Sequence, residues 1–226
     1  MDRKLYEDII GILTDKSRST RLIISRGETE AGTLREFLDV GRGSFEEFIE
    51  KNDENSDLDE MIRNCARCGP GLDKTFGRGT GKNGFMLVMN MPSMVAGIEK
   101  KYLGPESEGL LQKIVRAAEL DIADCYVTSL IKCEKGDPSL KPSQLYKSCE
   151  YILKKEIEYY APKIILVFGD IIPLQKIIKE SVDIHWYNID HPITLLKNPE
   201  LKKRAWGTLK LAMEKYGEMK SSGVIR

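Results

Sequence analysis

The stretch Pro162-Lys-Ile-Ile-Leu-Val-Phe-Gly169 decides the fold. Five apolar residues, Ile164 to Phe168, stand in a row between a proline and a glycine, which is typical of a strand buried on both faces. An amphipathic helical pattern over residues 143–160 precedes this strand, and another helical pattern follows it. A strand between two helices indicates a βαβ unit, so we expect a parallel sheet.

Three further β-prone stretches alternate with helical patterns on either side of this unit. The strands are expected at residues 85–89, 125–131 and 186–190, and the other helices at 110–120, 170–178 and 199–216. The sequence therefore predicts an α/β fold, a three-layer sandwich with a central, mainly parallel four-stranded sheet flanked by helices. In such sheets ligands bind at the carboxyl ends of the strands.

Charge divides the chain into two parts. Up to Asn64 there are 10 Lys and Arg against 16 Asp and Glu, whereas the remainder has 25 against 19, so the overall charge of zero is a cancellation. Ordinary variation in surface charge is the alternative. We predict a helical, acidic N-terminal extension over residues 1–60, a polar hinge within 51–60, and an α/β domain over 61–226.

Composition excludes several classes of protein. With 226 residues, 41% hydrophobic and 31% charged, the chain is neither collagen-like, mucin-like nor wholly disordered. No apolar run approaches the ~18 residues that a membrane span needs. The first residues lack the apolar stretch of a signal peptide, so we expect a cytoplasmic, monomeric protein with no membrane partner.

Four of the five cysteines form a pattern, with Cys65 and Cys68 as a Cys-x-x-Cys pair and Cys133 and Cys149 following. The pair can bind a metal from a tight turn, and the fold can bring the other two thiols close. Four thiolates suit either tetrahedral zinc or a [4Fe–4S] cluster, and the spacing does not choose between them. Buried free thiols are the alternative. Cys125 begins an apolar strand and is predicted to be a core residue.

Seven motifs follow one another between Cys65 and Tyr216. They are Cys65/Cys68, Met89-Asn-Met-Pro-Ser93, Tyr102-Leu-Gly-Pro105, Thr128-Ser-Leu-Ile-Lys-Cys133, Cys149 in Ser-Cys-Glu-Tyr-Ile, Pro162 to Gly169, and His191-Pro192-Ile193. In this order they resemble the family 4 uracil-DNA glycosylases, the iron–sulfur branch of that superfamily. The resemblance implies a DNA-repair enzyme that flips uracil or a related deaminated base out of single- or double-stranded DNA and hydrolyses its N-glycosidic bond.

The same resemblance implies the cofactor and the residues of the site. Cys65, Cys68, Cys133 and Cys149 would hold a [4Fe–4S] cluster with a structural or DNA-associated role, zinc being the alternative. His191 matches the histidine that donates toward the base and stabilises the anion that develops on it. Its alternative is an exposed turn residue, and His185 is predicted to lie at the surface or at a strand edge.

Four other residues complete the predicted site. Asn90 would position a water, although a carboxamide is no general base, and it could instead cap a turn before Pro92. Tyr102 would stack on the flipped base, or pack in the core. Ser129 would offer one hydrogen bond to the base edge, and Met91 is predicted to contact the substrate beside Asn90.

The chain departs from the family pattern at several of these positions. Asn90 stands where the family has Glu, Ser129 where it has the Asn that reads the uracil edge, and Ile193 where it has Ser. The stretch between Gly104 and Leu110 carries one residue more, and the segment to Asn64 has no counterpart. A serine offers one hydrogen bond where asparagine offers a donor and an acceptor, so we expect weaker or altered base discrimination.

Two segments are candidates for phosphate contacts. Main-chain amides near Gly77, Gly79 and Gly81, with Arg78 and Lys82, could approach phosphates, although a flexible loop accounts for a glycine-rich run equally well. Phosphate contacts with DNA are also expected from four basic residues after His191, or these form one solvated helix face: Lys197, Lys202, Lys203 and Arg204.

Three functions therefore stand beside one another. The first is a DNA glycosylase, which would be nucleoid-associated. The second is a catalytically weak or inactive protein that keeps the fold and the cluster and binds nucleic acid or a partner, for which the acidic N-terminal region is a candidate surface. The third is a zinc-stabilised α/β domain with no role on DNA.

Overall fold

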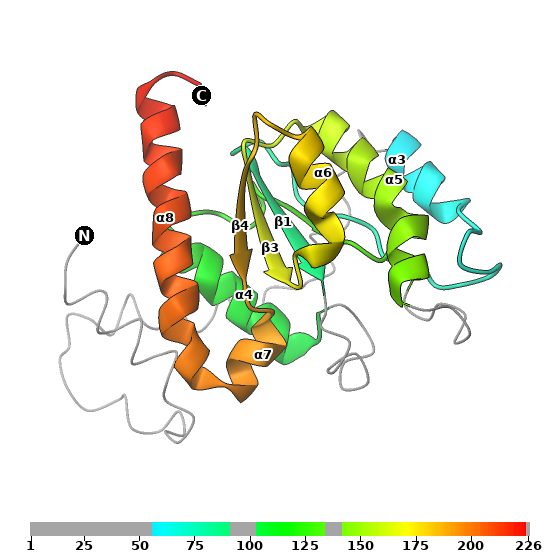
Figure 1. Cartoon of the computed structure of the whole chain (residues 1–226), viewed down its shortest axis with the longest axis horizontal. Coiled ribbons are helices and arrows are strands. Elements are labelled where there is room, and N and C mark those ends of the chain that lie inside the picture. Colours follow the sequence, from blue (N-terminus) through cyan, green and yellow to red (C-terminus); the bar gives the residue numbers. More distant parts are fainter. Residues whose placement is uncertain (1–55, 91–102, 134–141, 225–226) are drawn as a thin grey trace. The chain divides into compact units, whose positions relative to one another are not determined.

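The computed structural model describes residues 56–90, 103–133 and 142–224. Its centre is a four-stranded sheet of β1 (Phe85–Asn90), β2 (Tyr126–Ser129), β3 (Ile164–Gly169) and β4 (His185–Ile189), in the order β2-β1-β3-β4. All neighbouring strands run parallel. The prediction of a mainly parallel sheet within an α/β fold is therefore confirmed, and every described pair is parallel (Figure 1).

Apolar sequence explains the central strands. Every residue of β1 and β2 is buried, and β3 is buried up to Phe168. β4 is an edge strand with only Ile189 buried, and His185 begins it, as predicted for a strand-edge residue. Cys125, directly before β2, is fully buried and confirms its predicted core position.

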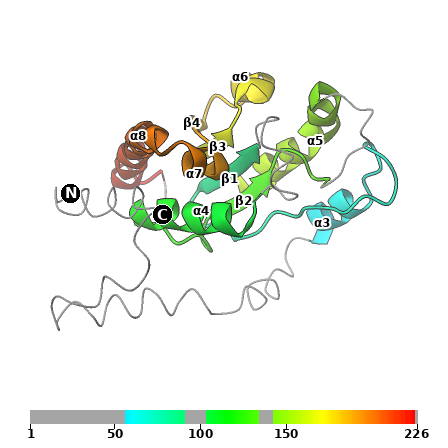
Figure 2. The same cartoon turned by 90° about the horizontal axis from the view of Figure 1, so that it is seen from below.

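Helices cover both faces of the sheet (Figures 1 and 2). On one face lie α3 (Ser56–Arg63), α5 (Pro142–Tyr160) and α6 (Gln175–Glu180), the last preceded by the 3-10 turn η3 (Ile172–Leu174). On the other lie α4 (Pro105–Ala117), α7 (Pro192–Lys197) and α8 (Lys202–Ser221), with the turn η4 (Pro199–Leu201) before α8. Successive residues of a strand point to opposite faces. Met86 and Val88 accordingly pack in the core under α5 and α6, while the ring of Phe85 meets Tyr216 of α8 at 4.7 Å.

Part of the stretch expected to form a hinge is a helix. α3 begins at Ser56, and its Leu58 and Ile62 are 8% and 0% exposed as the helix packs on α5. These two apolar residues are four positions apart and therefore lie on one face of the helix. The acidic residues around them make the stretch as a whole look polar, so the sequence pattern did not indicate a helix. The hinge prediction is thus wrong from Ser56 onward. The rest of the predicted extension, residues 1–55, lies outside the described residues.

The chain connections form a topological switch point between β1 and β3. After β1 the chain turns to α4 on one face, and after β3 it turns to α6 on the other. Adjacent strands whose connections leave in opposite directions form a topological switch point, where α/β proteins bind ligands. Asn90 and Gly169, which end the two strands and face each other in register, lie at this switch point.

Gly169 has a conformation that this junction requires. Its φ is +119°, and a Cβ at this position would overlap the main-chain carbonyl oxygen of Asn90. We expect Gly169→Ala to lower the free energy of unfolding by about 2 kcal/mol or more, because it adds backbone strain to a steric overlap. Gly109→Ala is the matched control, since that glycine lies in α4 with open space around it. There alanine should stabilise by about 0.5–1 kcal/mol.

Urea denaturation of the two variants measures both effects. Equal changes in stability at the two positions would contradict the steric argument for Gly169.

Candidate functional site

Asn90 joins β1 to the end of β3. The residue is 2% exposed, and Nδ2 donates a hydrogen bond to the main-chain oxygen of Asp170, the first residue after β3. The carboxylate of Asp170 in turn accepts from the amide of Ile172 at 2.9 Å. One of the two Nδ2 protons of Asn90 is therefore used within the protein, and a water would be held through the second N–H or the carboxamide oxygen. The alternative, a turn cap before Pro92, involves residues outside the described part of the chain.

Ser129 ends β2 at the same edge of the sheet. The residue is 2% exposed, and its Oγ donates to the carbonyl oxygen of Ile131 at 2.7 Å. A serine hydroxyl has one proton to donate, so in this arrangement Ser129 can only accept from a ligand. In the predicted hydrogen bond to a base edge, the base would therefore be the donor and Ser129 the acceptor.

His191 is buried, not exposed in a turn. It is 0% exposed and is the N-cap residue of α7, where its Nδ1 accepts from the amide of Ile193 at 3.3 Å. A ring nitrogen that accepts carries no proton, so this hydrogen bond assigns the proton of the neutral imidazole to Nε2. The imidazole is thus oriented with Nε2 as its donor. Ile193 contributes its main-chain amide here, so the cap does not depend on the side chain at position 193.

Two predicted substrate residues, Met91 and Tyr102, lie outside the described residues. Together with His191, the described part of the site consists of the two strand ends, Asn90 and Ser129, on neighbouring strands. Residues of β1, β2 and the turn after β4 therefore share the carboxyl edge of the sheet, as the sequence predicted.

A pocket beside this edge is lined in part by Asp190, a residue that the sequence analysis did not include in the site. It has a volume of about 280 Å³ and is lined by Asn188, Ile189, Asp190, Arg204, Ala205 and Thr208. Arg204 donates to both carboxylate oxygens of Asp190, at 2.8 and 2.6 Å. Asp190 directly precedes His191, so this pair ties the turn that holds the histidine to α8. Its position before the His-Pro turn was the available signal.

The basic residues after His191 do not form one uniform group. Arg204 is paired with Asp190, and Lys202 is only 8% exposed. Lys197 and Lys203 are exposed. The prediction of phosphate contacts therefore concerns these two lysines more than the others.

The glycine-rich run has a structural role beside β2. The amide of Arg78 donates to the oxygen of Val127 at 2.9 Å, and the amide of Val127 returns a bond of 2.8 Å, so the run covers the edge of the sheet. A Cβ at Gly77 would overlap Tyr126, and one at Gly79 would overlap the carbonyl of Cys125. Close packing thus explains these glycines.

The cations of the same run are paired within the protein. Arg78 forms an ion pair with Glu108 at 2.5 Å, and Lys82 with Asp124 at 2.8 Å. Both cations therefore have acidic partners within the protein, and phosphate contacts by this segment stay a prediction.

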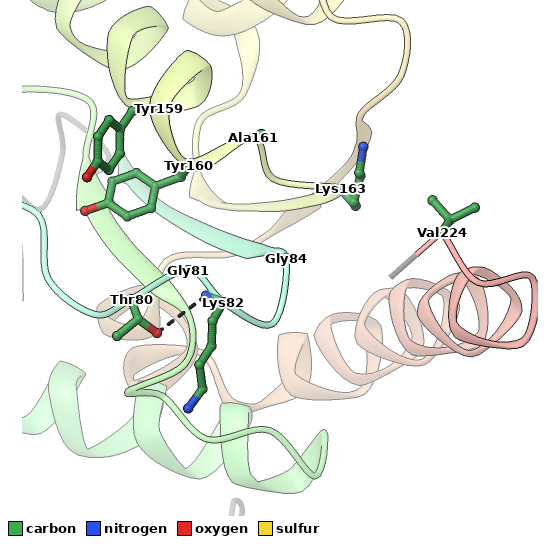
Figure 3. Close-up of a pocket in the computed structure, with 9 residues that line it drawn as sticks. All are labelled: Thr80, Gly81, Lys82, Gly84, Tyr159, Tyr160, Ala161, Lys163 and Val224. Atoms are coloured by element: carbon green, nitrogen blue, oxygen red, sulfur yellow. Dashed lines mark hydrogen bonds between the residues drawn. The ribbon is translucent and has the colours of Figure 1, made fainter. Parts of the chain in front are cut away.

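Figure 3 shows another pocket, which lies away from the predicted site. Its volume is about 460 Å³, and its lining includes Gly84, just before β1, and Lys163, just before β3. Both residues lie at the amino ends of their strands. Lys82 lines the same pocket, and its ammonium group and that of Lys163 point away from one another.

Three of the four predicted metal ligands pack together. Cys68, Cys133 and Cys149 form one buried cluster, at 2%, 8% and 2% exposure, and Cys65 is half-buried nearby. The ammonium of Lys74 links two of the segments, since it donates to the carbonyl of Cys65 at 2.5 Å and to Sγ of Cys133 at 3.5 Å.

The Cys-x-x-Cys segment also contacts α5. The guanidinium of Arg67 lies 3.7 Å from the ring centre of Tyr151, two residues after Cys149. Tyr151 also forms a hydrogen bond with Cys65. The structure thereby brings the pair toward the helix that carries the fourth cysteine.

Burial raises the pKa of two of these thiols. It raises the pKa of Cys149 to about 12 and also raises the pKa of Cys133. At Cys65, partial burial raises the pKa, but hydrogen bonds from Tyr151 and from the main chain of Arg67 outweigh it, so its pKa is lowered. Thiols bind metals as thiolates, so binding at Cys133 and Cys149 must release protons.

Within the described ranges, no group of three or more Cys, His, Asp or Glu side chains is arranged closely enough to hold one metal ion. Four cysteines that each bind a different iron of a cluster do not have to approach one another as closely as four ligands of one zinc. The thiol donor set and its convergence are compatible with such a cluster. No helix in the described part has the length and apolar character needed to cross a membrane.

The fold and the site define a class. The chain is a doubly wound α/β protein with polar side chains gathered at the switch point of a parallel sheet and a cluster of cysteines beside it. Residues 76–210 match the family described as the Uracil DNA glycosylase superfamily, and the chain belongs to this superfamily. The matched region includes Cys133 and Cys149 and begins after Cys68. No curated protein matches the chain.

The bond from Asn90 to Asp170 makes a prediction for Asn90→Asp. A carboxylate in this buried position would face a carbonyl oxygen and could not donate, so we expect a loss of about 2–4 kcal/mol in the free energy of unfolding at pH 8. Burial would raise the pKa of the new carboxyl above its unfolded value of about 3.9. The native state should then regain stability as pH falls, because the protonated carboxyl can donate again.

Denaturation at pH 5 and pH 8 tests this. Asn188→Asp is the matched control, since Asn188 also donates to this loop, to the carbonyl of Gly169 at 2.7 Å, but is exposed. It should cost less than about 1 kcal/mol at either pH. A deficit of Asn90→Asp that is the same at both pH values would contradict the proposed contact.

Proposed function

We propose that the protein is a DNA glycosylase of the family 4 type, which excises uracil or a related deaminated base from DNA. The observation that carries this proposal is the oriented, fully buried imidazole of His191 at the carboxyl edge of the sheet, in a chain that belongs to the superfamily. Breaking the N-glycosidic bond places negative charge on the departing base. A preorganised donor such as Nε2 of His191 would stabilise that charge.

The other residues of the edge would act on the flipped nucleotide. The carboxamide oxygen of Asn90 would hold the attacking water, and Ser129 would accept a hydrogen bond from the base edge. Tyr102 and Met91 would contact the base. The exposed Lys197 and Lys203 would contribute phosphate contacts, which supply much of the affinity for DNA.

We further propose that Cys65, Cys68, Cys133 and Cys149 hold a [4Fe–4S] cluster. Support comes from the all-thiol donor set and from the bonds of Lys74 and Tyr151 that draw the separate segments together. The cluster would act as a structural cross-link among α5, the segment after β2 and the Cys-x-x-Cys turn.

One observation favours a second function. Both polar side chains that replace the family residues, Asn90 and Ser129, donate to the main chain of this protein. A protein that keeps the fold and the cluster and binds DNA with little or no excision would fit that commitment. Single-turnover assays with excess protein on uracil- and hypoxanthine-containing oligonucleotides, single- and double-stranded, separate the two functions. Absence of abasic product on every substrate would refute the glycosylase.

For the glycosylase we expect His191→Ala to slow base excision roughly 100-fold or more, as loss of one preorganised donor does elsewhere. His191→Asn should be equally slow, and it keeps an N-cap acceptor for α7, so misfolding would not explain the loss. The control is His185→Ala, which removes the other histidine, at the edge strand β4. A normal excision rate for His191→Asn would remove the imidazole from the mechanism.

The cluster proposal predicts that Cys133→Ala loses iron and inorganic sulfide, together with the visible absorbance of the purified protein. Cys125→Ala is the control, because Cys125 is buried beside Asn83 at the start of β2 and is not one of the proposed ligands. It should keep four irons per chain. Zinc in the wild-type protein, or full iron content in Cys133→Ala, would show that the assignment is wrong.

A further inference from the structure

A pair of opposite charges is buried in the core and takes no part in the function proposed above. Lys132 is 1% exposed and Glu156 is 0% exposed, and Nζ of Lys132 lies 2.7 Å from each carboxylate oxygen. Two side chains of β2 complete the arrangement, since Tyr126 and Thr128 each donate to Oε1 of Glu156 at 2.9 Å. Lys132 also contacts the hydroxyl of Thr128. The carboxylate therefore has four hydrogen bonds from one strand and the segment after it.

Stability alone does not require this arrangement. Removing two charges from water is costly, and well-packed apolar residues in the place of a buried ion pair are often as stable or more so. A buried pair does specify geometry, because each charge is satisfied only where its partner lies. The question is therefore which two parts of the protein the pair holds in register.

The pair connects the segments that carry two of the proposed ligands. Lys132 directly precedes Cys133, and its amide donates to Sγ of Cys149 at 3.5 Å. Glu156 follows Cys149 by seven residues, which places both on one face of α5, two turns apart. A shift or rotation of α5 against β2 would break the pair and separate the two thiols together.

The main-chain carbonyl of Lys132 is held as well, by the segment that follows the Cys-x-x-Cys pair. This carbonyl accepts from the amide of Thr75 at 2.7 Å, and the neighbouring Lys74 bridges to Cys133. Lys132 is therefore the point at which α5, the end of β2 and the segment after the Cys-x-x-Cys pair are joined.

We propose that Lys132 and Glu156 are positioning residues for the cysteine site. The ion pair fixes the register of α5 against the segment after β2, and this register brings Cys133 and Cys149 to their common position. The inference rests on the proposed cluster for its consequence, which is retention of the cluster, but the positioning of the thiols stands on the contacts of the pair.

The experiment uses the full chain and three variants. Glu156→Gln removes the charge and keeps the shape, Lys132→Met removes the other charge, and the double variant Lys132→Met with Glu156→Leu replaces the pair by apolar side chains. The control is Glu158→Gln, which breaks an exposed pair of the same helix, with Lys155 at 2.6 Å. Circular dichroism and thermal unfolding establish that each variant is folded.

The first readout is the rate at which reconstituted protein loses iron to a chelator. For Glu156→Gln and for the double variant we expect this rate to rise roughly tenfold or more, as loss of an outer-shell partner does at other metal sites. The double variant should recover the unfolding temperature and still release iron fast. A double variant that recovers both stability and slow release would overturn the proposal, because the pair would then be merely structural.

The second readout does not need the cluster. In metal-free protein, a small alkylating reagent followed by peptide mass spectrometry gives the labelling rate of each cysteine. Cys149 and Cys133 should react several times faster in the double variant than in the wild type, while Cys125 keeps its rate as internal control. If the wild type binds no iron, a faster reaction still supports the positioning role and only the cluster proposal fails. Unchanged labelling ratios would overturn the positioning role itself.

Discussion

The parallel pairing of β1 with β3 is the constraint on which the rest of the structure depends. Both strands are apolar along nearly their whole length, so they must lie in the middle of the sheet with helices on both faces. The connection after β1 leads to α4 and the connection after β3 leads to α6, so the two strands flank a topological switch point. Asn90 and Gly169 meet there because the register of the two strands places them opposite each other.

The cysteines come together through contacts between segments that are distant in sequence. Main-chain pairing joins Lys74 and Thr75 to the residues after β2. The stacking of Arg67 on Tyr151 joins the Cys-x-x-Cys turn to α5. The buried pair of Lys132 and Glu156 joins α5 to β2. Three separate contacts therefore hold the segments that carry the four cysteines near one another.

The pattern of apolar residues predicted the strands, the helices and their layers. It could not predict which side chains pair with one another. The unbroken apolar runs of β1 and β3 led directly to the layers and to the edge that carries the site, whereas α3 was missed because acidic residues surround its two buried apolar residues. A lysine and a glutamate 24 positions apart carry no periodic signal, so the pair of Lys132 and Glu156 emerges only when β2 and α5 are packed. Arg204 lies in a basic stretch typical of phosphate ligands, but its partner is Asp190. The packing of Cys68, Cys133 and Cys149 against one another was predictable because their residue type is scarce and their spacing is characteristic, whereas their role as metal ligands stays a prediction.

In the proposed function, recognition of the base and stabilisation of the leaving group are two separate demands. The imidazole of His191 is oriented by the main-chain amide of Ile193, and this bond does not depend on the side chain at position 193. Recognition of the base edge would depend on Ser129, whose one proton is already donated to Ile131. Ser129 would therefore accept from a donor on the base, and it would discriminate poorly among bases that present one. On this proposal, Ser129 bears on which base is chosen and His191 on whether the glycosidic bond is broken.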